Sequence, residues 1–411
     1  MKKILLLLIV FAMMTSVVFA NGLSLNSIGP KGFGMGGAFI GLANDPTAIY
    51  WNPAGLVGQQ TGISLFTTDV IPFATFKNET FGIDAKTNTN HYISPNLFVN
   101  YNLGKFGLGF GAYVPAGLGA EWNGADLKAY NEDPSAEFEW MSEIGVFNFS
   151  PAFAYNFYQK FNVGVAANIY YGMLKMKKPE DMNQNQLLDT QTEFDIAGMG
   201  YGFTVSMKWK CFLTDKLDLG LTYRSPINVA FEGDAVMGAT YDAEMDIEWP
   251  AWYGFGAALV PNEKLTLTLD AQYSNWASLE KLIAKIKDMP NPQGGTFTYE
   301  KEMHLNWEDA VQIRIGSEYK INDLIAARLG YYYDPAPAPD ETLNILFPSS
   351  TNHVITTGFG ITKNKFSCDF GIEYLLGGER KIEDQDQTEN NMVGTHQMDT
   401  FAFSFGLGYK F

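Results

Sequence analysis

The stretch AVQIRIGSEY, residues 310–319, alternates between two kinds of side chain at successive positions. Its odd-numbered positions are mostly large and apolar, whereas its even-numbered positions are alanine, glutamine, arginine, glycine and glutamate. Successive side chains of a β-strand point to opposite faces, so this pattern predicts a strand with one apolar and one polar face. A strand of this kind suits a wall between lipid and a polar interior.

The same alternation recurs along the chain after residue 60. Clear examples are NVGVAANIYYG (162–172), LDLGLTYRS (217–225), VITTGFGITK (354–363) and FAFSFGLGYKF (401–411). We place strand centres near residues 68, 98, 112, 150, 168, 202, 222, 253, 270, 314, 329, 358, 371 and 405. These segments predict an all-β protein, a 14-stranded antiparallel transmembrane β-barrel over residues 61–411, because such barrels have an even number of alternating strands.

The connections between the expected strands are either short turns or long polar loops. In outer-membrane barrels the short turns face the periplasm and the long loops face outward. One long loop contains SLEKLIAKIKDM (278–289), whose leucines and isoleucines have helical spacing and predict a short amphipathic helix. Tryptophans near the expected strand ends predict an aromatic girdle at the lipid interface. They are Trp122, Trp140, Trp209, Trp249, Trp252, Trp276 and Trp307.

Residues 1–20 have the build of a cleaved secretory signal. Lys2 and Lys3 precede an apolar run that ends at Phe19, and small residues lie before Asn21. We therefore expect the mature chain to begin at Asn21. Beyond residue 20, no apolar stretch is long enough for a transmembrane helix, so strands must make any membrane crossing.

The charge balance excludes one class of partner. The chain carries 28 Lys and Arg against 45 Asp and Glu, a formal net charge of −17. Nucleic-acid binding depends on cations that neutralise phosphates, so this balance argues against nucleic acid as a partner. The acidic residues gather in the long loops, where solvation is their simplest role.

The sequence shows no motif for catalysis, a cofactor or a metal. The four histidines are scattered without metal-ligand spacing. The run GFGMGG (32–37) has the glycine spacing of a dinucleotide fingerprint, but no strand precedes it. His353 with Ser349 or Ser350 is the local candidate for hydrolysis, and it lacks a nucleophile motif. We therefore expect no cofactor, no metal site and no enzymatic activity.

Residues 21–60 break the strand pattern. They do not alternate, and they contain nine glycines and the sequence NPAGL (52–56). A lumen enclosed by fourteen strands has room for a compact element whose backbone groups are paired within the protein. We therefore expect residues 21–60 to form a plug inside the barrel, ahead of barrel residues 61–411.

Several stretches resemble one known family. The segment FGMGGAFIGLANDPTAIYWNPAGL (33–56) is similar to the N-terminal hatch of the FadL/TodX family of outer-membrane hydrophobe transporters, whose hallmark matches Asn52, Pro53 and Ala54. Further similar stretches follow in the same order. They are KFGLGFGAYVPAGLGAEW (105–122), LTYRSPI (221–227), LDAQYSNW (269–276) and RLGYYYDPAPAPDETLNILFP (328–348).

The resemblance implies a lateral exit route. In the family the hatch blocks the lumen, and an inward kink of the third strand opens a window toward the membrane; the matching positions are Pro115, Ala116 and Gly117. Proline lacks a ladder donor and glycine tolerates irregular backbone, so this tripeptide should interrupt strand pairing. The alternative is an ordinary β-bulge at a barrel rim.

The candidate ligand contacts are of two kinds. Apolar contacts are expected from Phe33, Met35, Phe39 and Leu118, with simple packing of the hatch as the alternative. Inward-facing cations for a carboxylate are expected at Arg224, Arg314 and Arg328, with salt bridges to the hatch or to Glu318 as the alternative. The internal site of the family uses basic residues, yet the position matching its fifth strand is Gly172, which leaves uncharged ligands open.

The resemblance therefore implies passive transport across the outer membrane of a Gram-negative bacterium. Long-chain fatty acids are the first expected substrate, and uncharged aromatic or alkane hydrophobes are the alternative. A general porin or an adhesive barrel is the other reading, although a plug argues against an open pore. The expected partners are outer-membrane lipid, lipopolysaccharide and the barrel assembly machinery, whose terminal recognition signature resembles the C-terminal strand ending at Phe411.

Overall fold

The computed structural model describes residues 22–158, 160–291, 293–384 and 391–411. The expected signal, residues 1–20, lies outside the described residues. No helix among those residues is long and apolar enough to cross a membrane.

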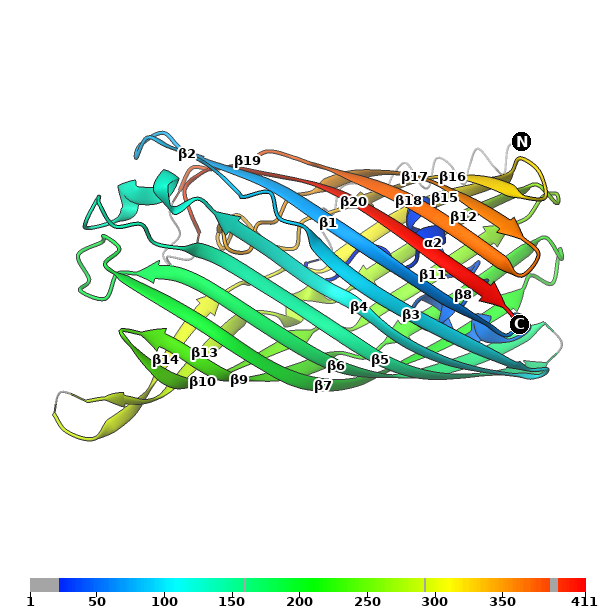
Figure 1. Ribbon diagram of the computed structural model, residues 1–411, viewed down its shortest axis with the longest axis horizontal. Coiled ribbons are helices and arrows are strands. Elements are labelled where there is room, and N and C mark those ends of the chain that lie inside the picture. Colours follow the sequence, from blue (N-terminus) through cyan, green and yellow to red (C-terminus); the bar gives the residue numbers. More distant parts are fainter. Residues whose placement is uncertain (1–21, 159, 292, 385–390) are drawn as a thin grey trace.

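The wall of the molecule is a closed antiparallel β-barrel (Figure 1). Over the described residues, fourteen strands pair in chain order, and the last pairs with the first from Gly62↔Lys410 to Lys77↔Thr395. The strands are β1 (Gly62–Asn78), β3 (Tyr92–Leu103), β4 (Phe106–Trp122), β5 (Trp140–Tyr158), β6 (Phe161–Glu180), β7 (Thr190–Lys210), β8 (Leu217–Arg224), β11 (Trp252–Leu259), β12 (Leu265–Ser274), β15 (Ala310–Lys320), β16 (Ile325–Asp334), β17 (Asn352–Lys363), β18 (Phe366–Gly377) and β20 (Gly394–Lys410). Each contains one expected centre, so the fourteen-stranded barrel is confirmed.

The two ends of the barrel differ. One end, called here the turn end, carries the C-terminus and short connections such as those after Leu103 and Lys363. The opposite loop end carries the long connections, with short helices η2 (Gly124–Tyr130) and η3 (Trp276–Ser278). It also carries the extra strands β2 (Ile83–Lys86), β9 (Ile227–Met237), β10 (Ala239–Trp249), β13 (Lys281–Pro290), β14 (Thr296–His304) and β19 (Arg380–Ile382). Because long loops of outer-membrane barrels face outward, the loop end is the outer end.

The helix expected at residues 278–289 is wrong. Lys281–Pro290 is strand β13, which pairs with β14 and, at Ile286 and Lys285, with β10. Leu282, Ala284 and Ile286 are buried with a period of two, so pairing with neighbouring strands overrode the helical spacing. Strands β9 and β10 likewise pair with each other in a hairpin.

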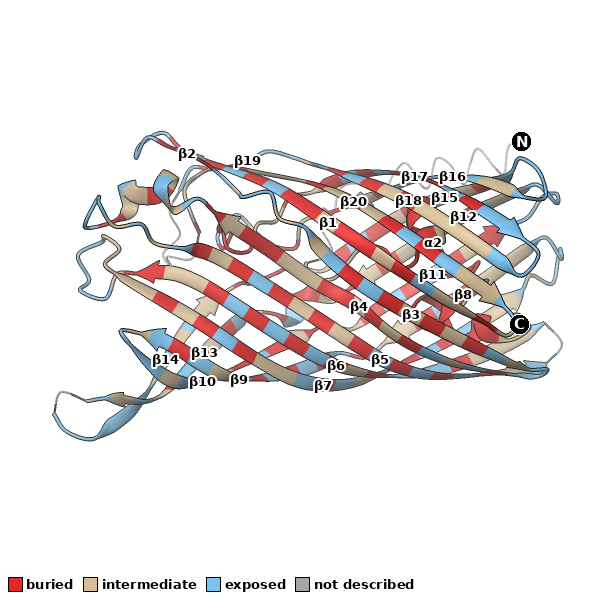
Figure 2. Ribbon diagram, in the orientation of Figure 1, coloured by how far each residue is buried: buried red, intermediate tan, exposed pale blue. Residues whose placement is uncertain are grey.

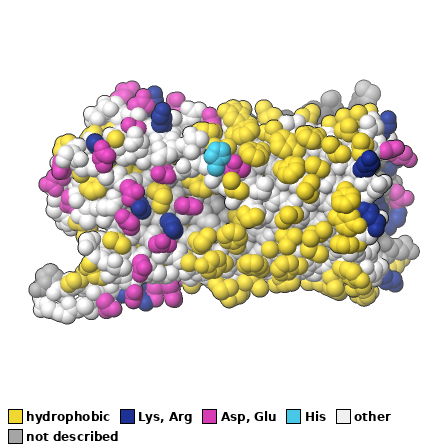
Figure 3. Space-filling model, in the orientation of Figure 1, with side chains coloured by type: hydrophobic (Ala, Val, Ile, Leu, Met, Phe, Trp, Pro, Cys, Tyr) yellow, Lys and Arg dark blue, Asp and Glu magenta, His cyan; other side chains and the backbone are white. Residues whose placement is uncertain are grey.

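Side chains alternate along the wall as the sequence predicted. In β15 the even-numbered residues from Ala310 to Glu318 are buried, whereas Val311 and Ile315 are exposed. Figure 2 shows the same alternation of buried and exposed residues along the neighbouring strands. Hydrophobic side chains gather over the half of the barrel nearer the turn end, with charged groups beyond them at both ends (Figure 3). This exposed apolar band is the surface that faces lipid.

The expected girdle of tryptophans is wrong for six of its seven members, and the seventh, Trp209, is half-buried. Trp122, Trp140, Trp249, Trp252, Trp276 and Trp307 are all buried. Trp122, for example, donates from Nε1 to the carbonyl oxygen of Ile345, and the rings of Trp276 and Trp307 lie 5.2 Å apart. A position near a strand end does not determine which way a side chain points. Most of these rings pack within the barrel and its loop end and do not face lipid.

Residues 22–60, called here the inner segment, lie inside the barrel. The inner segment contains α2 (Pro30–Gly34), α3 (Ala48–Trp51) and η1 (Pro53–Leu56). Helix α2 contacts β16, β17, β18 and β20, whereas η1 contacts β4, β5, β6 and β7 on another part of the wall. The inner segment therefore crosses the interior, toward the turn end in Figure 1.

Candidate functional site

The sequence Asn52–Ala54 anchors the inner segment to the wall. The Asn52 amide donates to the carbonyl oxygens of Ile40 and Met207, both at 3.0 Å. The backbone N–H of Ala54 donates to Ser206 Oγ at 2.9 Å. One side chain thus joins two parts of the inner segment to β7, which accounts for an asparagine at this position.

A glycine on the wall makes room for this anchor. A Cβ atom added at Gly164 of β6 would lie 2.2 Å from the backbone nitrogen of Ala54. Any larger residue would therefore push the anchor away from the strand. The fit between the anchor and the wall is a backbone-to-backbone contact.

All three candidate arginines are held by protein groups. Arg328 pairs with Glu318 at 2.8 Å and with Asp369 at 2.7 Å, and Lys31 of the inner segment adds a second cation at 3.3 Å from Glu318. Arg314 donates to the side chain of Gln312 and to the carbonyl oxygen of Gly36, and its guanidinium lies 4.1 Å from the ring centre of Tyr332. Arg328 therefore joins strands of the wall to one another, and Arg314 joins the wall to the inner segment.

Arg224 is held in the same way. Its guanidinium donates to the carbonyl oxygen of Tyr50 at 3.0 Å. It also lies over the rings of Tyr50 and Trp252, at 4.5 Å and 5.1 Å from their centres. Arg328 thus forms the expected salt bridge to Glu318, whereas Arg224 and Arg314 reach the inner segment through its backbone carbonyl oxygens.

The pairing of β3 with β4 stops halfway along the barrel. It runs only from Leu103↔Phe106 to Leu97↔Ala112, although both strands continue toward the loop end. Beyond that point β3 pairs with β1 alone, up to Tyr92. Pro95 of β3 lies just past the last pair and cannot donate a ladder hydrogen bond. We call the unpaired stretch between the two strands the break.

At the break, β4 bends toward the inner segment. Its pairing with β5 shifts between Tyr113↔Asn148 and Ala116↔Val146, so one extra residue is accommodated on β4. The backbone N–H of Leu25 donates to the carbonyl oxygen of Pro115, and that of Gly117 donates to Leu23, at 2.9 and 3.0 Å. On the side where β3 would otherwise pair, Pro115 and Gly117 thus form hydrogen bonds with the inner segment.

Polar side chains supply further hydrogen bonds across the break. Asn96 of β3 accepts a hydrogen bond from the backbone N–H of Val114 through Oδ1 at 3.0 Å. Nearer the loop end, the amides of Asn88 and Asn90 donate to the carboxylate of Glu121 at 3.0 and 2.7 Å. Side-chain hydrogen bonds therefore bridge the break at these positions.

The ring of Tyr92 lies in the break. A Cβ atom added at Gly119 of β4 would be 2.0 Å from Cζ of Tyr92, so the ring occupies the space that a side chain at Gly119 would take. The adjacent Ile93 is 67 % exposed, as lipid-facing apolar residues are. Tyr92 therefore stands between the interior and the lipid-facing surface.

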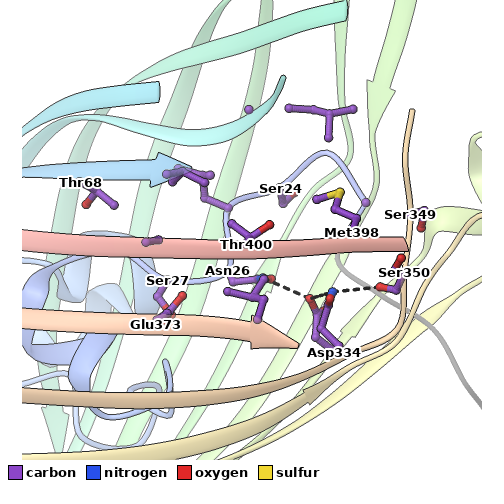
Figure 4. Close-up of a pocket in the computed structure, with 18 of the residues that line it drawn as sticks. Ser24, Asn26, Ser27, Thr68, Asp334, Ser349, Ser350, Glu373, Met398 and Thr400 are labelled. Atoms are coloured by element: carbon purple, nitrogen blue, oxygen red, sulfur yellow. Dashed lines mark hydrogen bonds between the residues drawn. The ribbon is translucent and has the colours of Figure 1, made fainter. Parts of the chain in front are cut away.

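A cavity of about 120 Å³ lies directly inside the break (Figure 4). Its wall includes Gly117 and Leu118 of the kinked strand, Val70 of β1 and Phe33 of α2. Of the four candidate apolar contacts, Phe33 and Leu118 therefore reach this inner cavity. Met35 and Phe39 do not line it and are fully buried elsewhere in the inner segment.

The polar side of the inner cavity carries two carboxyl groups. Asp334 accepts hydrogen bonds from the amides of Asn26, Gln312 and Asn352. Glu373 accepts one from the hydroxyl of Tyr332 at 3.2 Å. Among the described residues that line this cavity, none is a lysine or an arginine. The cavity therefore offers no positive charge to an anionic ligand.

A second cavity, of about 560 Å³, lies among the loops at the outer end. Tyr130, Trp140, Leu346 and Met392 give it apolar walls, and Lys178 lies at its side. Lys178 pairs with Glu180 at 2.8 Å, and Lys301 pairs with the same carboxylate. Two cations thus share one anion here, which makes this corner of an acidic protein locally positive.

Lys178 lies beyond the lipid-facing band, which ends on β6 near the exposed Met173. Burial lowers the pKa of Lys178, and the nearby Glu180 opposes that shift. A further anion would stabilise the charged form of the lysine in the same way.

The residues considered for hydrolysis do not come together. The Nδ1 atom of His353 lies 2.7 Å from the hydroxyl of Tyr331, and His353 is exposed, whereas Ser350 is buried beside the inner cavity. No group of three His, Cys, Asp or Glu side chains suited to a metal occurs within the described parts of the chain.

Comparison with known proteins decides the family. The family model described as "Outer membrane protein transport protein (OMPP1/FadL/TodX)" matches residues 11–411. The chain belongs to the FadL/TodX family. It is therefore an outer-membrane transport protein of a family that is not enzymatic.

Relatives and solved structures of the FadL/TodX family cover most of this chain. It is 20% identical to the long-chain fatty acid transport protein of Escherichia coli O6:H1, over 92% of this chain and 84% of that protein. It is 21% identical to outer membrane protein P1 of Haemophilus influenzae over the full length of both. The structures of a Pseudomonas aeruginosa FadL homologue and of the Pseudomonas putida toluene transporter TodX align with TM-scores of 0.80 and 0.75, at 16% and 17% identity. The first alignment covers 95% of this chain and all of the homologue, and the second covers 96% of this chain and all of TodX.

Sequence reasoning missed three residues of this FadL/TodX site: Tyr92, Gly119 and Glu373. Glu373 carried a signal, because an acidic residue on the inward parity of a strand in the lipid-facing band needs a reason to be there. Tyr92 and Gly119 carried none, because the contact between them depends on where two strands separate.

Proposed function

We propose that this protein carries hydrophobic compounds across the outer membrane and releases them sideways through the break between β3 and β4. The compound enters the outer cavity, passes to the inner cavity and leaves past Tyr92 toward lipid. The observation that supports this most is the end of β3–β4 pairing at Leu97↔Ala112, with the inner cavity directly behind it. In this proposal the inner segment is the hatch that denies a straight path through the lumen.

Energy favours such a path for an apolar molecule. Burial of each methylene group contributes roughly 0.8 kcal/mol. An apolar molecule would lose this free energy for every methylene group that it exposes in a water-filled pore. Apolar walls at the outer cavity, the inner cavity and the lipid-facing surface keep its free energy nearly level. Passive diffusion along the route then needs no energy source.

For the substrate we propose small uncharged hydrophobes of about one ring. The inner cavity of about 120 Å³ is close to the roughly 150 Å³ at which an apolar cavity holds benzene. Asp334 and Glu373 together with the absence of a lining cation in the described wall disfavour a carboxylate there. The toluene transporter TodX shares the fold, which is compatible with this substrate class.

Long-chain fatty acids are the second candidate. The outer cavity is larger and carries the positive corner formed by Lys178 and Lys301 around Glu180. A carboxylate head group would be attracted there while its tail lies on the apolar wall. Curated relatives at 20% identity are long-chain fatty acid transport proteins, which is compatible with this candidate.

Uptake of labelled toluene and labelled palmitate tests the proposal. Cells that produce the protein should take up toluene faster than cells without it, and palmitate no faster. Faster uptake of palmitate alone would contradict the proposed substrate class, and no gain for either compound would contradict transport itself.

A matched pair of variants tests the fatty-acid candidate. If palmitate is a substrate, Lys178→Met should slow its uptake, because the outer cavity loses a cation. Lys175→Met is the control, because Lys175 lies on the same strand, pairs with Asp195 at 3.3 Å and does not line the cavity. Equal uptake by both variants would contradict a role for the positive corner.

A further inference from the structure

We propose that the turn end of the barrel binds anionic phospholipids of the periplasmic leaflet through a ring of lysines that contact the lipid phosphates. This inference goes beyond the proposed function, because it does not depend on which compound the protein carries. It follows from where the positive charges of an acidic protein lie and from the side chains beside them.

Every short turn of the barrel carries at least one exposed lysine. The turns at the turn end join β3 to β4, β5 to β6, β7 to β8, β11 to β12, β15 to β16 and β17 to β18. A further exposed lysine ends β20. We call these nine residues the lysine ring: Lys105, Lys160, Lys210, Lys216, Lys264, Lys320, Lys363, Lys365 and Lys410. Figure 3 shows Lys and Arg side chains at this end, just beyond the lipid-facing band.

The lysine ring gives the turn end the opposite sign to the whole chain, whose formal net charge is −17. Among the described residues of the same turns, the exposed acidic side chains are Asp215, Glu263 and Asp323. At the loop end, by contrast, neighbouring strands place exposed carboxylates directly opposite one another, as in Asp195↔Asp234 and Asp242↔Asp234. An anion is therefore attracted to the turn end and repelled from this part of the loop end.

Most members of the lysine ring are available to an anion from outside the protein. Lys160 and Lys210 form salt bridges, with Asp215 and Asp218. Within the described part of the chain, the other seven lysines form no salt bridge, and Lys216 donates to the carbonyl oxygen of Pro261 at 2.7 Å. The positive charge of the lysine ring is thus largely uncompensated by the protein.

Exposed apolar side chains lie directly beside the lysine ring. Phe106, Phe366 and Phe411 each follow a ring lysine in the chain, and Tyr319 precedes one. All four are at least 41 % exposed, and Phe212, in the turn between β7 and β8, is 90 % exposed. At the boundary of a bilayer, such side chains lie among the lipid tails while a neighbouring lysine reaches the head groups.

A phospholipid is the anion that fits both features. Its tails cover the lipid-facing band and the apolar residues beside the lysine ring, and its phosphate lies at the level of the ammonium groups. A soluble acidic partner would leave those apolar residues uncovered around the barrel. Lipopolysaccharide belongs to the outer leaflet, whereas the turn end faces the periplasm.

Spin-labelled lipids test this surface on the full-length protein in phosphatidylcholine bilayers. Electron paramagnetic resonance measures how strongly labelled phosphatidylglycerol associates with the protein relative to labelled phosphatidylcholine. The wild-type protein should prefer phosphatidylglycerol roughly threefold at low salt, because the attraction acts at one of its two ends. The preference should shrink in about 0.5 M salt, a second measurement that needs no variant, because salt screens exposed charges.

Two variants with the same change in net charge separate the two ends. The turn-end variant replaces four ring lysines that form no salt bridge: Lys105→Gln, Lys264→Gln, Lys320→Gln and Lys363→Gln. The loop-end control replaces four exposed lysines near the opposite end: Lys77→Gln, Lys86→Gln, Lys285→Gln and Lys381→Gln. The turn-end variant should lose most of the preference for phosphatidylglycerol, and the loop-end control should keep it.

Three results would overturn the lipid surface. They are equal association of both lipids with the wild-type protein, an equal loss of preference in both variants, and a preference kept by a turn-end variant whose circular dichroism shows an intact barrel. Any of them would leave the lysine ring to a soluble partner or to solvent. Because toluene uptake is measured separately, none of these results would contradict hydrophobe transport.

Discussion

Two seams of the same barrel behave differently. The seam between β1 and β20 is paired without interruption from Gly62 to Lys77 of β1, along nearly the whole strand. The seam between β3 and β4 is paired only near the turn end and opens beyond Leu97↔Ala112. Both are antiparallel and both face lipid, so closure of the barrel does not require every seam to be paired throughout.

The difference lies in what replaces the missing partner. At the closed seam each strand's backbone is satisfied by the other strand. At the open seam the inner segment, through Leu23 and Leu25, and the side chain of Asn96 take over part of that role. A barrel can thus keep its backbone paired while one seam is left free for passage.

The substitution with the largest expected effect interrupts the closed seam. Phe403 of β20 sits between partners on β1 and β18, so Phe403→Pro should prevent assembly, because proline is not tolerated in a central strand. Val114→Pro at the open seam should still assemble, because the lost donor there is bonded to a side chain. The amount of folded protein in outer membranes checks this; equal loss for both variants would contradict the contrast.

A smaller effect sharpens the account of the open seam. Asn96→Ala leaves the backbone N–H of Val114 without its acceptor and should cost about 1–3 kcal/mol of folding free energy, the usual penalty for a buried unpaired group. Asn102→Ala is the control, because the Asn102 side chain accepts from the backbone N–H of Gly104 in an exposed turn. Urea unfolding in detergent measures both, and equal midpoints would show that Asn96 does not replace a strand partner.

The smallest expected effect concerns the ring in the open seam. Tyr92→Ala should raise toluene uptake roughly threefold, which corresponds to about 0.7 kcal/mol of barrier, because the ring leaves the exit. Tyr101→Ala, on the paired and lipid-facing part of the same strand, should leave uptake unchanged. Uptake that is unchanged or lower for Tyr92→Ala would mean that the ring does not obstruct passage.

Much of the wall could be predicted from the sequence, because alternation is a local property of each strand. The stretch around Arg314 showed both the strand and its inward face, and the structure agrees. Pro115 and Gly117 likewise marked an interruption through their own backbone chemistry. These features require no knowledge of the neighbouring strand.

The errors and omissions have the opposite origin. Lys281–Pro290 has helical spacing but becomes a strand because β10 and β14 offer pairing partners. Trp276 lies at a strand end, yet its ring turns inward against Trp307. The ring of Tyr92 occupies space that is open because Gly119, on another strand, has no side chain. Each of these depends on which segments meet, and a single sequence does not state that.

The most direct test closes the open seam. In the variant, Pro115 is deleted to remove the extra residue of β4, and Ala116→Thr and Gly117→Val restore ordinary strand residues so that pairing with β3 can continue. Toluene uptake is then measured in cells with equal amounts of folded wild-type and variant protein. The account predicts that uptake by the variant falls to the level of cells without the protein. Uptake equal to that of the wild type, in a variant with an intact barrel, would contradict lateral exit between β3 and β4.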